Sequence, residues 1–167
     1  RMIMKKITPK FTVVTALIVL AIASRLLPHP PNFAPITGIA LFAAHRFQHK
    51  GFAYVLPLAC LFITDLVLGL SWINIAVYSA FIGITWMGTK SQRVNAKTVL
   101  FSSVFFFLWT NLAVWFLHYP KNIEGMIQCF TLAIPFFTNT LLGDLFYTGV
   151  LFFSFSTIQK RFPLLQS

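Results

Sequence analysis

The feature that most constrains this chain is a series of long apolar runs separated by short polar connections. A hydrophobic content of 57% in 167 residues exceeds what a soluble domain of this length buries. Most of the runs approach the roughly 20 residues that cross the hydrocarbon core of a bilayer. The sequence therefore predicts an all-α membrane protein whose single domain covers residues 1–167. The six predicted spans are approximately residues 11–27, 33–45, 52–70, 72–88, 98–118 and 128–158.

Three of these segments have unusual features. The first follows a basic stretch and resembles a signal peptide, but we expect it to be retained as the first helix. Segment 33–45 has only 13 residues, so it needs shielding by neighbouring helices or local thinning of the bilayer. Segment 128–158 is long and contains Pro135, which indicates either a separate piece before the helix proper or a kink in its first turns.

The basic residues predict the orientation of the spans. They lie in short clusters between apolar runs, which favours the lipid bilayer over nucleic acid as the partner of this chain of net charge +10. With six spans, 11 of the 13 lysines and arginines fall on one side, and only Arg25 and Lys121 fall on or near the other. Since lysine and arginine stay preferentially in the cytoplasm, both termini are predicted to be cytoplasmic.

Two of the three acidic residues, Asp65 and Asp144, lie inside predicted spans, where an unpaired charge is expensive. Arg25 is the only basic residue near their depth. Counting the rise of each helix, we expect its side chain to reach Asp65, and Asp144 less easily. The alternative is an arginine that extends towards the outer lipid headgroups without a partner.

Other polar residues share helix faces and could line one cavity with these charges. Asn111, Trp115 and His118 share one face of the fifth segment, and Asn74 and Tyr78 share one face of the fourth. The alternatives are ordinary hydrogen bonding between helices and, for Trp115, an aromatic belt at the membrane interface. The candidate substrate-binding residues are Arg25, Asn32, Asp65, Asn74, Tyr78, Asn111, Trp115, His118, Asn139 and Asp144.

Enzyme signatures are weak. The chain has no nucleophilic serine motif and no glycine-rich phosphate loop, and its four histidines do not form a convincing metal site. We therefore predict no catalytic residues, no metal and no cofactor, and we expect Cys60 and Cys129 to serve packing. The rival classes are an intramembrane enzyme acting on a lipid-linked substrate and a structural subunit of a membrane complex.

The stretches "RLLPHPPNFAPITGIALF", "PLACLFITDLVLGL" and "IPFFTNTLLGDLFYTGVLFF" carry a resemblance. The chain resembles a family of small bacterial membrane proteins described as transport proteins. That family is similar to the substrate-binding S-components of energy-coupling-factor (ECF) vitamin transporters. The resemblance implies a six-helix bundle in the bacterial cytoplasmic membrane that captures a vitamin-like solute near the outer face. The loop at residues 28–35 would close the site.

The resemblance also implies a partner, the ATP-driven ECF energising module. Many S-components dock to it through an Ala-x-x-x-Ala patch on the first helix, but here Ala16, Ala21 and Ala23 do not have that spacing, whereas Ala40 and Ala44 on the second segment do. Solitary operation, as in S-component-like cobalamin transporters, is the alternative, and it makes cobalamin one candidate solute. Those transporters place a cysteine at the cobalt, whereas Cys60 is predicted towards the cytoplasmic half of its span.

Overall fold

Every predicted apolar segment forms a helix in the computed structural model, which describes residues 8–165. No strand occurs in that range, so the predicted all-α class is confirmed. The elements are α1 (Pro9–Ala23), the 3₁₀ turn η1 (Ser24–Leu26), α2 (Ile36–Arg46), α3 (Lys50–Leu68), α4 (Ile73–Lys90), α5 (Ala96–His118), α6 (Ile123–Arg161) and the 3₁₀ turn η2 (Pro163–Leu165).

Several helices begin at residues whose side chains cap the free backbone N–H groups of a first turn. Thr8 accepts from the N–H of Phe11 ahead of α1, and Pro9 follows it at a position that needs no N–H. Asn95 and Asn122 play the same capping part for α5 and α6. Helix α3 ends at Gly69, whose φ of 110° is open to glycine and strained for other residues.

Four helices are long and apolar enough to cross a membrane: α1 together with η1, α3, α5 and α6. The chain therefore has the character of a multi-pass membrane protein. Helix α2 differs, because its 11 residues rise only about 16 Å, roughly half the thickness of the hydrocarbon core. The number of complete spans and the side on which the termini lie stay predictions.

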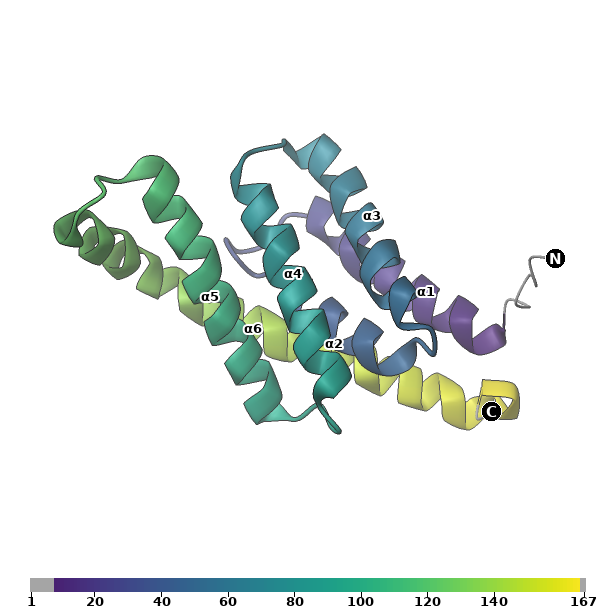
Figure 1. Ribbon diagram of the computed structural model, residues 1–167. Helices are drawn as coiled ribbons and strands as arrows, with labels where there is room; N and C mark the ends of the chain where they lie inside the picture. The colour runs from purple at the N-terminus through teal and green to yellow at the C-terminus, as the bar shows by residue number, and fades with distance from the viewer. Residues whose placement is uncertain (1–7, 166–167) are drawn as a thin grey trace.

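Helix α2 is enclosed by the other helices (Figure 1). All nine residues from 36 to 44 are buried, and α2 contacts α1, α3, α4, α5 and α6. The predicted shielding of this short segment is thus confirmed. Ala40 and Ala44 are 0% and 1% exposed, and Ala44 lies directly against Gly88 of α4. The pair formed by Ala40 and Ala44 is therefore internal and is not a surface patch.

Helix α6 is the longest element, with 39 residues and a length of about 58 Å. It runs diagonally along the whole bundle, and its first half pairs with α5 in a hairpin that projects beyond the other helices (Figure 1). Pro135 lies inside this continuous helix. The interpretation of residues 128–134 as a separate piece is therefore wrong, because they belong to the same helix as the residues after Pro135.

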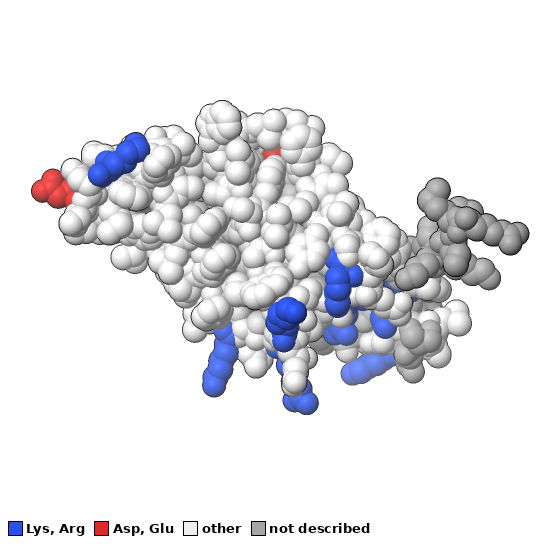
Figure 2. Space-filling view, viewed as in Figure 1, with Lys and Arg blue, Asp and Glu red and all other residues white. Residues whose placement is uncertain are grey.

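Basic side chains gather along one side of the molecule (Figure 2). That side carries the α2–α3 and α4–α5 connections, while the α3–α4 and α5–α6 connections lie at the opposite ends of their helices (Figure 1). Lys121 and Glu124 lie at the α5–α6 end. This separation of charge has the form that the basic clusters of the sequence predict for a membrane-embedded bundle.

A glycine-to-alanine pair tests the close packing of α2. A Cβ on Gly38 would lie 2.9 Å from the backbone nitrogen of Thr148, whereas a Cβ on Gly149 meets nothing within 4 Å. Both substitutions gain helix propensity, but only Gly38→Ala forces two backbones apart, at a cost of about 1–3 kcal/mol. We expect a lower thermal midpoint in detergent for Gly38→Ala and an unchanged or higher one for Gly149→Ala. Equal midpoints would contradict the packing.

A labelling pair tests the orientation. In a background where Cys60 and Cys129 are replaced by alanine, we place single cysteines at Gln92, in the α4–α5 connection, and at Lys121, in the α5–α6 connection. An impermeant maleimide added to intact cells should modify Lys121→Cys and should reach Gln92→Cys only after the membrane is opened. Labelling of Gln92→Cys from outside would overturn the predicted topology.

Candidate functional site

The Arg25 side chain turns into the bundle and pairs with Asp65. Arg25 Nη2 lies 2.7 Å from Asp65 Oδ1, and the two side chains are only 14% and 3% exposed. Arg25 Nη1 donates to the Thr64 hydroxyl at 2.7 Å, and that hydroxyl donates in turn to the Leu61 carbonyl. The predicted pairing of Arg25 with Asp65 is confirmed, and the arginine does not extend alone towards the headgroups.

Tyr78 completes this group, here named the Arg25 cluster (Arg25, Thr64, Asp65 and Tyr78). The Tyr78 hydroxyl donates to Asp65 Oδ2 at 2.6 Å, so both carboxylate oxygens are bound. Asn74 lies one turn earlier on α4 and accepts from the N–H and hydroxyl of Ser71. The cluster joins η1, α3 and α4 by bonds that its own members satisfy. The charges of Arg25 and Asp65 therefore serve to hold η1, α3 and α4 together.

A second contact links η1 to α6. The Ser24 hydroxyl lies 2.8 Å from the hydroxyl of Tyr147, and the ring of Phe33 packs against that of Tyr147. The backbone at Phe33 comes so close to Gly143 that a Cβ there would lie 3.2 Å from it. Both ends of the connection at residues 27–35 are thus attached to the bundle. Asn32, within it, is exposed and has a left-handed φ of 61°.

Asp144 is the second buried acid, 2% exposed on α6. It lies 2.6 Å from the Ser103 hydroxyl of α5, and the hydroxyl and backbone N–H of Thr37 face it from α2. Helix α2 begins at Pro35, which provides no side-chain cap. Asp144 therefore stands where the free N–H groups of this buried helix need an acceptor. Within residues 8–165 no basic side chain forms an ion pair with it.

The remaining predicted residues do not join these groups. Asn111 donates to the Phe107 carbonyl of its own helix, and Trp115 Nε1 donates to the Pro120 carbonyl just beyond α5. His118 is exposed and Asn139 is half-buried. The expected convergence of the polar faces is not found on α5, because its second half belongs to the projecting hairpin (Figure 1).

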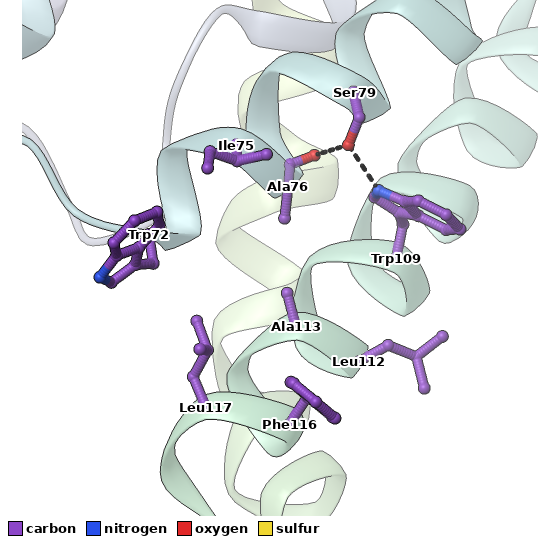
Figure 3. Close-up of a pocket in the computed structure, with 9 residues that line it drawn as sticks. All are labelled: Trp72, Ile75, Ala76, Ser79, Trp109, Leu112, Ala113, Phe116 and Leu117. Atoms are coloured by element: carbon purple, nitrogen blue, oxygen red, sulfur yellow. Dashed lines mark hydrogen bonds between the residues drawn. The ribbon is translucent and has the colours of Figure 1, made fainter.

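An apolar groove between α4 and α5 was not predicted from the sequence. It encloses about 510 Å³, and Figure 3 shows the two helices diverging from a contact in which Trp109 Nε1 donates to the Ser79 hydroxyl at 2.9 Å. The missed signal is a helical spacing of aromatic and small residues on both helices. The lining residues are Trp72, Ile75, Ala76, Ser79, Trp109, Leu112, Ala113, Phe116 and Leu117.

The part of the chain that the structure describes contains no candidate metal site and no pair of bonded cysteines. No three His, Cys, Asp or Glu side chains there are placed to hold a metal ion. Cys60 is a half-buried free thiol packed against the apolar core, and Cys129 is a buried one whose Sγ donates to the Asn111 carbonyl. Both cysteines act as packing residues in this structure.

The chain belongs to a family of unknown function (DUF6580), whose family model matches residues 5–165. No curated protein and no solved structure matches the chain.

A double-mutant cycle measures the Arg25–Asp65 interaction. Removing either partner leaves the other charge buried, which costs about 3–5 kcal/mol for a buried pair. Arg25→Ala and Asp65→Ala should each lower the thermal midpoint in detergent strongly, and the double variant should recover much of the loss. The cycle thus has a large coupling energy. A coupling energy of zero would show that the pair contributes nothing in the membrane-extracted protein.

Proposed function

We propose that this protein is a membrane-embedded binder and translocator of a small, vitamin-like organic solute, and that the α4–α5 groove is its binding place. The observation that carries the proposal is the groove itself. Its volume of about 510 Å³ lies within the range of roughly 300–1,000 Å³ that small-molecule sites occupy. Its lining of apolar and aromatic side chains with very few polar groups is also typical of such sites.

The lining indicates the chemistry of the solute. Trp72 and Trp109 are 76% and 45% exposed, so indole faces are open to a flat ring. The Ser79 hydroxyl donates to the Ala76 carbonyl and accepts from Trp109, which leaves little capacity for further hydrogen bonds. The favoured solute is therefore a largely apolar, ring-bearing molecule. A corrinoid such as cobalamin is much larger than this groove and would enter it only in part.

The buried charges support the groove without lining it. Tyr78, held by Asp65, is the neighbour of Ser79 along α4, so the Arg25 cluster fixes the turn of α4 that forms one wall. The ion pair is internally satisfied, and breaking it to bind a charged solute would leave a buried charge uncompensated. In this proposal the buried charges hold the helices in place, and the apolar faces of the groove bind the solute.

The source of energy is a separate part of the proposal. The chain has no nucleotide motif, so ATP would have to be used by a partner. Ala40 and Ala44 are buried, so docking to an energising module would need another surface in this conformation. Solitary operation in the bacterial cytoplasmic membrane is consistent with that arrangement.

The test is native mass spectrometry of the protein released from lipid nanodiscs, with a groove-filling variant. Ala113→Trp places a large ring inside the groove, and Val67→Trp places the same ring on a surface of α3 that is 73% exposed. We expect a bound small molecule in the wild type and in Val67→Trp, and at least a tenfold loss in Ala113→Trp.

Three outcomes would contradict the proposal. A molecule retained equally by both variants would place binding elsewhere. Turnover of an added lipid-linked substrate by the isolated chain would favour the enzyme. A stable partner subunit with no bound molecule would favour the structural role.

A further inference from the structure

The Ser103 hydroxyl has more acceptors than protons. Its oxygen lies 2.9 Å from the Val99 carbonyl oxygen and 2.6 Å from Asp144 Oδ2. A hydroxyl carries one proton, and both a carbonyl and an ionised carboxylate can only accept. If Asp144 were ionised, the single proton of Ser103 would have to serve both contacts, and one pair of oxygens would lack a hydrogen-bond proton between them. A proton on Asp144 removes the conflict.

Asp65 shows what an ionised acid looks like in the same bundle. It receives a guanidinium on Oδ1 and the Tyr78 hydroxyl on Oδ2, so every short contact has its own proton. The Thr64 hydroxyl likewise accepts from Arg25 and donates to Leu61. Each short contact around Asp65 therefore has one proton when this carboxylate is charged. Around Ser103 and Asp144, each short contact has one proton only when the carboxyl is neutral.

The surroundings of Asp144 agree with a neutral group. The side chains that face it are Ser103 from α5 and Thr37 from α2, and neither is charged. On its own helix the next titratable side chain is Tyr147, whose hydroxyl contacts Ser24. The one ion pair among residues 8–165 is the one that Arg25 makes with Asp65. A carboxylate 2% exposed inside a membrane bundle is costly without a cation.

We propose that Asp144 is a proton-binding site, occupied by one proton in this arrangement of the helices. Asp144 Oδ2–H donates to Ser103 Oγ, and Ser103 donates to the Val99 carbonyl. When α6 moves away from α2 and water enters, the proton passes from Oδ2 to that water and leaves a carboxylate. The site goes beyond the proposed function, because it holds whether or not the groove binds a solute.

This assignment has a consequence for how the protein is driven. The closed packing of α2 on α6 goes with the protonated acid, and the hydrated arrangement goes with the ionised one. Protonation therefore shifts the balance between the two arrangements. A proton gradient across the membrane would then supply free energy for a conformational change in a chain that has no nucleotide motif of its own.

Infrared spectroscopy tests the site directly, since the chain has only three acidic side chains. Glu124 is exposed and Asp65 is paired with Arg25, so a carbonyl band of a protonated carboxyl in the wild type is assigned to Asp144. The ester carbonyls of the lipid absorb in the same region, but they carry no exchangeable proton and do not shift in D₂O. We expect this band in nanodiscs and a downshift of it in D₂O. It should be lost in Asp144→Asn and kept in Asp65→Asn. Absence of the band from the wild type overturns the proposal.

Two further measurements separate protonation from folding. Asparagine is close in shape to a neutral carboxyl, so Asp144→Asn should keep a thermal midpoint near that of the wild type, whereas Asp65→Asn should lower it by leaving Arg25 unpaired. Ser103→Ala removes the hydrogen-bond acceptor and should shift the band to higher frequency. If Asp144→Asn fails to fold, the band of the wild type and its shift in Ser103→Ala still decide. An unshifted band in Ser103→Ala would overturn the proposed hydrogen bond.

Discussion

The structure depends on one demand, the burial of the short helix α2 from Ile36 to Ala44. Backbone groups at helix ends need partners, and the first turn of this helix is buried inside the bundle. At the start, Asp144 of α6 stands by the free N–H groups. At the end, Lys50 Nζ donates to the carbonyls of Ala44 and Phe47 at 2.7 and 3.3 Å. The positive charge of Lys50 at the C-terminus also matches the helix dipole.

Enclosing a helix on all sides requires small residues where other backbones cross it. Gly38 admits α6 at Thr148, Gly88 admits Ala44 of α2 to α4, and Gly143 admits the connection at Phe33. Gly38 sets how closely α6 approaches α2, which is the approach that brings Asp144 to Thr37. The packing of α6 on α2 therefore also determines the position of the buried acid. A larger residue at Gly38 would move the acid away from the start of α2.

The parts that sequence reasoning predicted are those where one residue had few possible partners. The helices followed from apolar length, and Arg25 was assigned to Asp65 because no other base lies at that depth. The groove escaped prediction because aromatic and small residues at helical spacing also describe an ordinary packed face. The polar face of α5 failed for a related reason. Helical periodicity places Asn111 and Trp115 on one side of their helix. It does not predict that this part of α5 belongs to a projecting hairpin, which lies away from the buried charges.

The two buried acids, Asp65 and Asp144, have different roles in the bundle. Asp65 is compensated by a cation on an adjacent element, so its bonds resist separation of η1, α3 and α4. Asp144 has only neutral neighbours in the described chain, so its burial depends on a proton that water can remove. The contact between α2 and α6 is thus the one whose strength changes with protonation. Because Phe33 packs against Tyr147 and lies close to Gly143, a movement of α6 there would carry the connection at residues 27–35 with it.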